Sequence, residues 1–452
     1  MKRLVYVWFL ASVAALGGFL FGFDTAVISG ALSPLIQYFD LASQPVFQGW
    51  LVSSVVLGSV VGALLSGYSA DRFGRKPTLV WVGILFFMSS IGSAVSDTFV
   101  MFICFRLVAG VAVGMAAMVS PLYIAEVAPV AIRGRMVALN QFALTIGILV
   151  AYFSNNFIGS MVSDQVHALA SLFAPVEIWR MMLGAAAIPS LVFLLLLVFM
   201  PESPRFLMLI QRDSAAFNIL RKLNGSQMAQ KEMQLSRSTM AGTTISVGGL
   251  FKPPLRMTTF IALYLAIVSQ LSGIDLVLHY GPLILERAGF SFMDSLGGQL
   301  VFGVVLVVFT LLAMWKVDTL GRRPLLFAGN AGICITLLLI GYLFTDDAFS
   351  ETGLLVAIAC FVACFAFSMG PIPWIVMAEL FPTKVRGQAM ALATFSLFGA
   401  NWIIAQLFPV SMEYLGESAT FWLLAVITLP TFIFIWKYLP ETKGKTMEEE
   451  VQ

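Results

Sequence analysis

The chain has 452 residues, of which 59% are hydrophobic and only 11% are charged. Soluble globular domains carry about 25% charged residues, so this composition excludes a soluble protein and predicts a helical protein that crosses a membrane many times. The net charge of +2, with no polybasic stretch, argues against a nucleic-acid partner.

Apolar runs of about 20 residues recur along the chain between short polar breaks, as expected for transmembrane helices. We therefore expect an all-α membrane protein with twelve spans. They lie near Val5–Leu32, Val46–Ala70, Pro77–Val95, Val100–Val127, Met136–Ile158, Trp179–Met200, Leu255–Leu285, Leu296–Val317, Pro324–Phe344, Gly353–Leu380, Gly387–Ser411 and Ser418–Leu439.

The longest break, Pro201–Pro254, is polar and divides the chain into two parts of six spans. Apolar residues recur at helical spacing within Ser203–Leu223, which predicts one or two short amphipathic helices. We expect a six-helix bundle over residues 1–200, a cytoplasmic linker over 201–254, a second bundle over 255–440 and a tail over 441–452.

Basic residues gather in the breaks on one side of the predicted membrane, and acidic residues in the breaks on the other. Because cytoplasmic loops carry an excess of lysine and arginine, the basic side should be cytoplasmic. We therefore expect a multi-pass protein of the cytoplasmic (inner) membrane with both termini inside. The basic residues are Arg72, Arg75, Lys76, Arg133, Arg135, Arg205, Arg212, Arg221, Lys222, Arg322, Arg323, Lys384, Arg386, Lys443 and Lys445.

An internal repeat relates the two parts, because three motifs return in the same order about half a chain later. It predicts two six-helix halves related by an axis along the membrane normal, an arrangement suited to alternating access around a central site. The motif pairs are Asp71–Pro77 with Asp318–Pro324, Pro121–Gly134 with Pro373–Gly387, and Pro201–Pro204 with Pro440–Thr442.

These repeated motifs place acids and arginines at the cytoplasmic helix ends. We expect ion pairs among them to latch the two halves when the cytoplasmic side is closed, since acids at a membrane edge are usually paired. The alternative is ordinary loop charge of a positive-inside protein. The residues concerned are Asp71, Arg72, Arg75, Glu126, Arg133, Asp318, Arg322, Glu379 and Arg386.

Asp24 is the only charged residue between Val5 and Leu32. A carboxylate inside hydrocarbon costs about 2.5–3.5 kcal/mol on insertion scales and is usually functional. Arg106, twenty residues before the cytoplasmic Glu126, stands at about the same height by the helical rise per residue. Arg106 is therefore the expected partner of Asp24.

Catalytic and metal-binding patterns are absent from the sequence. Cys360 and Cys364 lie one helical turn apart, but no histidine or further cysteine joins them, so we interpret them as core residues. With no nucleophile–base set and no phosphate-binding glycine loop, we expect neither an enzyme nor a cofactor.

The motifs together resemble the sugar porter family of the major facilitator superfamily, over nearly the whole chain. The resemblance implies that superfamily's fold and transport of a monosaccharide (a pentose or hexose) or polyol, either passively or with a proton. It rests on Gly67-x3-Asp71-Arg72-x-Gly74-Arg75-Lys76, Arg106-x3-Gly110, Pro121-x-Tyr123-x2-Glu126, Asn140-Gln141, Pro201-Glu202-Ser203-Pro204-Arg205, Gly370-Pro371-x-Pro373-Trp374, Glu379-x-Phe381-Pro382 and Pro440-Glu441-Thr442-Lys443-Gly444.

The resemblance also bears on coupling, because proton symporters of the family carry an acid at the position of Asp24 and an arginine at that of Arg106. Passive facilitators have a neutral amide at the position of Asp24. We therefore expect a monomeric proton–monosaccharide symporter in the lipid bilayer, with Asp24 as proton carrier paired to Arg106. The alternatives are a passive sugar or polyol uniporter and a transporter-like sugar sensor.

Amide and indole side chains inside apolar spans are the candidates for sugar binding, because they match hydroxyls and apolar sugar faces. The alternative for each is packing against a neighbouring helix. The resemblance carries sugar contacts onto Gln141, Gln270, Tyr280, Trp374 and Asn401.

The second half departs from the family pattern near this site. Asp275 stands where relatives have asparagine, His279 where they have tyrosine, and Leu306 and Leu397 where they have polar residues. Asp275 is a further substrate-binding candidate, either as a carboxylate that accepts from hydroxyls or, protonated, as an amide mimic. It disfavours an anionic substrate.

Overall fold

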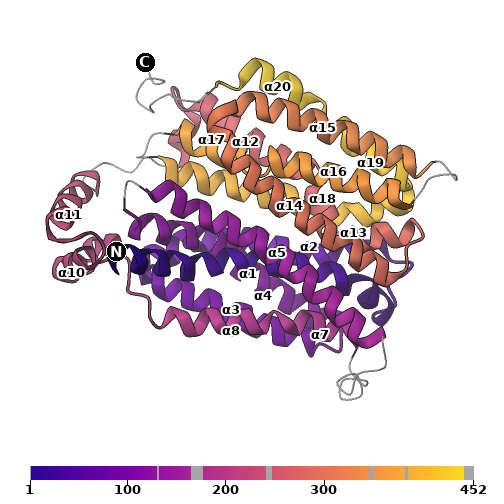
Figure 1. The fold of residues 1–452 in the computed structure, drawn as a ribbon, viewed down its shortest axis with the longest axis horizontal. Helices are drawn as coiled ribbons and strands as arrows, with labels where there is room; N and C mark the ends of the chain where they lie inside the picture. The colour runs from indigo at the N-terminus through magenta and orange to yellow at the C-terminus, as the bar shows by residue number, and fades with distance from the viewer. Residues whose placement is uncertain are drawn as a thin grey trace.

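The computed structural model describes residues 2–129, 132–163, 177–240, 247–345, 351–381 and 385–441. Within them the chain forms helices and no strand, and twelve helical segments are long and apolar enough to cross a membrane. The prediction of an all-α protein with twelve spans is confirmed. The helices of the first and second parts of the chain lie in two groups side by side (Figure 1).

The first six spans are α1 (Lys2–Tyr38), α2 (Pro45–Phe73), α3 (Arg75–Ala94), α4 (Phe99–Val127), α5 (Arg133–Ser163) and the pair α7 (Ile178–Ala185) and α8 (Ala187–Leu197). The first of them is longer than the apolar run predicted, since α1 continues at both ends beyond Val5–Leu32. Apart from the last pair, each of these spans is a single helix.

Between the two groups lie α9 (Pro204–Leu209), α10 (Asp213–Asn224), α11 (Ser226–Met240) and the short 3₁₀ helix η2 (Val247–Phe251). The first two correspond to the predicted amphipathic helices. The third was not predicted, because its sequence is polar and lacks the apolar stripe on which that prediction rested. Figure 1 shows α10 and α11 outside the bundle, beside the start of the chain.

The last six spans contain more interruptions. Their helices are α12 (Arg256–Leu271), α13 (Ile274–Arg287), α14 (Phe292–Leu320), α15 (Arg322–Leu343), α16 (Glu351–Phe367), α17 (Ile372–Leu380), α18 (Arg386–Tyr414), α19 (Glu417–Thr428) and α20 (Pro430–Tyr438). Spans seven, ten and twelve are each divided in two, where the sequence predicted continuous runs.

Glycine and proline account for two of these breaks. Gly273 has a φ of +89° and caps α13 in the left-handed region, which other residues adopt only at a cost. Pro371 caps α17 after a turn at Ser368–Gly370, and a proline has no N–H with which to continue a helix. Expected substrate ligands adjoin both breaks: Gln270 and Asp275 flank the first, and Trp374 follows the second.

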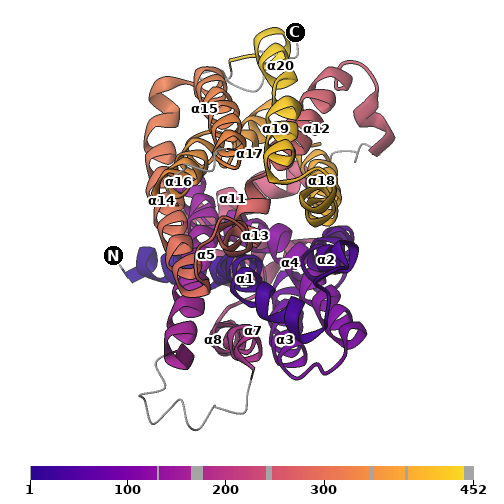
Figure 2. The same ribbon diagram turned by 90° about the vertical axis from the view of Figure 1, so that its right-hand side faces the viewer.

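We call the end of the molecule that carries Gly74 and Gly321 the motif end, and the other end the far end. Hydrogen bonds between the two halves lie toward the far end, where α2 starts and α18 ends. They join Ser29 to Gln299 (2.9 Å), Ser33 to Glu286 (2.7 Å), Ser53 to Gln406 (2.6 Å), and the Tyr152 hydroxyl to the Leu278 carbonyl (3.0 Å). Figure 2, which looks along the helices, shows α1, α5 and α13 near the middle.

Candidate functional site

A buried ion pair links the first and fourth spans. Arg106 Nη1 lies 2.9 Å from Asp24 Oδ1, and the two side chains are only 3% and 6% exposed. The second carboxylate oxygen, Oδ2, and the arginine Nε are buried without a hydrogen-bond partner. The pair therefore cancels its charge locally but retains an unused proton-accepting oxygen.

Close helix packing sets the position of Asp24. A Cβ on Gly17 would collide with Ser120 of α4, and one on Gly22 would collide with the Leu144 carbonyl of α5. These glycines let α1 approach both helices at backbone distance, as small residues do in membrane bundles. Asp24 is thereby held against α4, where Arg106 meets it.

Polar groups flank the break between α12 and α13. Gln270, in the last turn of α12, is 8% exposed and keeps its Oε1 atom buried and unpartnered. Asp275, in the first turn of α13, is partly exposed, and its Oδ2 accepts from Asn401 Nδ2 of α18 at 2.5 Å. The amide oxygen of Asn401 is also buried and unpartnered. The break thus gathers acceptor oxygens that a hydroxyl-bearing ligand can satisfy.

The other predicted ligands lie on α5 and α17. Gln141 is partly exposed on the first half of α5, and Trp374 is partly exposed in the first turn of α17, directly after the break. Trp374 packs against the buried cluster that includes Ala262, Ala266 and Met377. Its indole therefore has a fixed position and still presents part of its surface.

Tyr280 is placed differently from the expectation that it contacts substrate. It is 0% exposed, donates its hydroxyl to the Ala405 carbonyl of α18 at 2.9 Å, and packs on Phe408 with ring centroids 5.0 Å apart. Its hydroxyl is therefore bonded within the protein and is not free to bond to a sugar. In this conformation Tyr280 positions α13 against α18.

Sequence reasoning assigned no ligand role to two residues that adjoin predicted ligands. Trp402 follows Asn401 on α18, and its indole N–H is buried without an acceptor; the Oδ1 atom of Asn140, beside Gln141 on α5, is buried without a donor. The signal was available, since each directly adjoins a predicted ligand. A neighbour in sequence points about 100° away around a helix, so adjacency alone does not assign either residue to the site.

The repeated motifs form matching networks at the motif end. In the first half, Arg75 pairs with Glu126 (3.0 Å) and Asp71 (3.3 Å), and Glu202 accepts from the backbone N–H groups of Arg75 and Lys76 (3.0 and 3.2 Å). Glu202 therefore caps the N-terminus of α3, where the helix dipole favours a negative charge.

The second half repeats this geometry. Arg322 pairs with Glu379 at 2.8 Å, and Glu441 accepts from the N–H groups of Arg322 and Arg323 at 2.9 and 3.0 Å. Gly321, like Gly74, has positive φ, and a Cβ there would meet the capping glutamate. The Pro-Glu-Ser and Pro-Glu-Thr motifs are thus the caps of the Gly-Arg turns.

Each of these ion pairs joins helices of the same half, so they do not form the latch between halves that the sequence predicts. Arg72 bonds instead to the Tyr68 hydroxyl, and the exposed Arg133 donates to the Ala128 carbonyl at 3.4 Å. The side chains of Asp318 and Arg386 lie outside the described residues.

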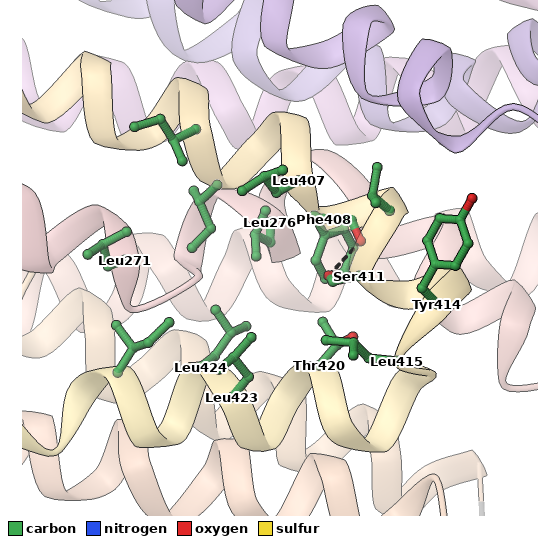
Figure 3. A pocket seen from close by; sticks show the side chains of 14 residues that line it. Leu271, Leu276, Leu407, Phe408, Ser411, Tyr414, Leu415, Thr420, Leu423 and Leu424 are labelled. Carbon is green, nitrogen blue, oxygen red and sulfur yellow. Dashed lines mark hydrogen bonds between the residues drawn. The ribbon is translucent and has the colours of Figure 1, made fainter.

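An apolar groove in the second half is distinct from these polar groups. Figure 3 shows Leu407 and Phe408 of α18 facing Leu423 and Leu424 of α19, with Leu271 of the α12–α13 break at one end. None of the predicted sugar ligands lines this groove. A sugar needs convergent donors and acceptors, so we do not assign the groove as its site.

The comparisons with known proteins decide the family. The profile described as "Sugar (and other) transporter" matches residues 10–451. The chain belongs to this sugar transporter family of the major facilitator superfamily. The predicted family and fold are thus confirmed, and the protein is a multi-pass membrane transporter rather than an enzyme.

Two relatives within the sugar transporter family are similar over nearly their whole length. The arabinose-proton symporter of Bacillus subtilis (strain 168) is 37% identical over 447 residues, covering 98% of this chain and 94% of that protein. The D-xylose-proton symporter of Escherichia coli (strain K12) is 34% identical over 475 residues, covering 98% and 95%.

Solved structures give the same result. A partially occluded inward-open conformation of the xylose transporter XylE from E. coli matches with a TM-score of 0.84 at 33% identity, covering 98% of this chain and all of that one. An inward-open conformation of XylE matches with a TM-score of 0.83 at 34% identity, covering 98% and 99%.

Proposed function

We propose that the protein is a proton-coupled symporter that imports a monosaccharide by alternating access. The observation that carries this proposal is the buried Asp24–Arg106 pair with its unpartnered carboxylate oxygen. The names of the arabinose- and D-xylose-proton symporters support the general activity. A pentose or hexose is the substrate class.

Asp24 is the proton carrier in this proposal. While Arg106 lies beside it, the carboxylate is stabilised in its charged form; a conformation that separates the two favours uptake of a proton. Protonation is then linked to the conformational equilibrium, since each ligand shifts it by its differential affinity for the two states.

The substrate site in this proposal is formed between the halves by residues of α5, of α18 and of the breaks before α13 and α17; at the first break Asn401 of α18 bonds to Asp275. The carboxylate and amides would bond to sugar hydroxyls and the indole would cover an apolar sugar face. Tyr280 supports the site by fixing α13 on α18. The proposed ligands are Gln141, Gln270, Asp275, Trp374 and Asn401.

The conformation is inward-facing, with the motif end in the cytoplasm of a bacterial cell and the protein in its inner membrane. The hydrogen bonds between Ser29 and Gln299 and between Ser53 and Gln406 support a closed far end. Both XylE structures reported above are described as inward open. The latch between halves forms in the opposite, outward-facing conformation. One chain, with both halves, suffices for transport.

Uptake into proteoliposomes tests the function. Purified protein is reconstituted and given labelled L-arabinose or D-xylose, with and without an inward proton gradient. We expect concentration of at least one sugar that depends on the gradient. Asp24→Asn should abolish concentration but retain exchange of sugar across the membrane.

The matched control is Asp294→Asn, an exposed carboxylate that accepts a hydrogen bond from the Ser291 hydroxyl at the start of its own helix, α14. It should behave as the unmodified protein. Equilibration without concentration in the unmodified protein indicates a uniporter, and gradient-driven concentration by Asp24→Asn removes the role assigned to Asp24.

A further inference from the structure

Among the described residues, two carboxylates, Asp24 and Asp275, lie on spans that meet at the centre, and one of them is paired with an arginine. Asp24 is neutralised by Arg106 at 2.9 Å, whereas Asp275 has a neutral amide, that of Asn401, as its hydrogen-bonding partner. No lysine, arginine or histidine lies within ion-pair distance of Asp275 among the described residues. The negative charge of Asp24 is thus neutralised by a partner, whereas a negative charge on Asp275 would not be.

We propose that Asp275 is a second proton-binding site, one that neutralises the substrate site and makes sugar affinity depend on pH independently of Asp24. The inference rests on the proposed sugar site. The step is the transfer of one proton from a hydronium ion to Oδ1 of Asp275: an O–H bond of the hydronium ion breaks, an O–H bond to Oδ1 forms, and a neutral water molecule is left. Oδ2 continues to accept from Asn401.

The depth of Asp275 supports this assignment. It is the twentieth residue of a 32-residue span, Arg256–Arg287, which places it near the middle of the bilayer. A charged carboxylate at that depth requires a partner of opposite charge or a proton. Its partial exposure gives a proton access to it.

The ionisable neighbours of Asp275 do not supply the missing positive charge. Tyr152 of α5 interacts with it electrostatically but is fully buried and donates to the Leu278 carbonyl. His279, one turn later on α13, is buried, so a positive charge on it would be costly to desolvate; it interacts with the backbone of Asp275 and is repelled by Arg106 of α4. Asp24 of α1 carries the same sign as Asp275.

Protonation of Asp275 would also add a hydrogen-bond donor to a site whose unpartnered groups are acceptors. Gln270 Oε1 and Asn401 Oδ1 are both buried and unpartnered. An ionised Asp275 would add further acceptors and a charge that a bound sugar would seal from water. Protonated, the same side chain offers one donor and one acceptor, as an amide does.

Infrared titration tests the proton site without any sugar. Difference spectra are taken between Asp24→Asn and Asp24→Asn/Asp275→Asn, so that Asp24 contributes nothing. We expect the C=O band of one protonated carboxyl at neutral pH, which converts to carboxylate bands at alkaline pH. Carboxylate bands alone from neutral to alkaline pH would overturn the proposal. The infrared bands report the protonation of Asp275 even if the protein binds no sugar. A failure to bind sugar would therefore count against the proposed function and not against the proton site.

Equilibrium binding tests the consequence for substrate. Labelled L-arabinose and D-xylose are titrated into the same two proteins across that pH range. We expect affinity in Asp24→Asn to fall by about tenfold or more, equivalent to about 1.4 kcal/mol, as Asp275 ionises. The double variant should bind equally well at every pH.

Two outcomes of the binding experiment contradict the inference. One is a sugar affinity that still depends on pH in the double variant, because the dependence would then arise from another group, such as His279. The other is tighter binding of D-glucosamine than of D-glucose that requires Asp275, which shows an ionised carboxylate neutralised by a cationic ligand.

Discussion

The two halves of this transporter share their motif ends but differ in the helices that meet at the centre. In the first half, spans one and four are the continuous helices α1 and α4 and carry Asp24 and Arg106. In the second, the corresponding spans are divided into α12–α13 and α16–α17. The breaks carry most of the proposed sugar ligands.

This difference assigns separate tasks to the halves. A buried ion pair needs fixed geometry to offset its desolvation, and unbroken helices provide it. A substrate site needs backbone that can bend, and a break between two half-helices is the usual place for one in transporters. The shared caps at Gly74 and Gly321 anchor the two halves in the same way, so the asymmetry is confined to the centre.

The largest expected effect comes from breaking the ion pair of the first half. Arg106→Leu leaves the Asp24 carboxylate buried and unpaired, which should lower the free energy of unfolding by about 3–5 kcal/mol. Thermal unfolding of the purified protein in detergent measures this loss. Arg106→Leu/Asp24→Asn should lose clearly less, because no buried charge remains; equal losses in the two variants would show that the charge is not the cause.

The capping glutamates test whether the motif ends of the halves are equivalent. Glu202→Ala and Glu441→Ala each remove charge-assisted hydrogen bonds from the first two backbone N–H groups of the helix that they cap, worth about 1.5–3 kcal/mol; Glu202 also accepts from the N–H of its neighbour Ser203 at 2.7 Å. The two losses, measured by the same unfolding experiment, should be similar. If the two losses differ by more than about 1 kcal/mol, the two caps share their geometry but do not contribute equally to stability.

Gly273→Ala tests whether transport depends on the helix break before α13. Alanine at a φ of +89° costs about 1–2 kcal/mol, and its Cβ would approach Leu424 to 3.0 Å. We expect lower stability and slower sugar exchange. Gly399→Ala is the matched control, because that helical glycine of α18 has nothing within 4 Å of its Cβ position. Unimpaired exchange in Gly273→Ala would show that the break does not bend during transport.

Features that depend only on regular helices could be predicted from the sequence. Apolar runs indicated the spans, and the rise per residue placed Asp24 level with Arg106, where the structure pairs them. The break at Gly273 was not predicted, because the apolar run continues through it and hydropathy does not register backbone conformation.

The contact between Asp275 and Asn401 was also beyond the sequence. Depth can be counted along a helix, but the rotation of one helix toward another depends on how α13 packs against α18. The same limit applies to Tyr280, whose burial against Phe408 depends on that packing. The capping glutamates were visible as repeated motifs, whereas their partners required the fold.

The smallest expected effect is that of Tyr280→Phe, and comparison with Gln270→Leu distinguishes a supporting residue from a sugar ligand in the second half. Tyr280→Phe removes the hydrogen bond to the Ala405 carbonyl and should lower stability by about 0.5–1.5 kcal/mol. Sugar affinity, measured by equilibrium binding, should stay within a factor of about two, since a tenfold change needs about 1.4 kcal/mol. Gln270→Leu, which removes an unpartnered buried acceptor, should instead weaken affinity with little loss of stability. If Tyr280→Phe weakens binding as much as Gln270→Leu, its hydroxyl leaves Ala405 to contact the sugar, and α13 must shift against α18 when substrate binds.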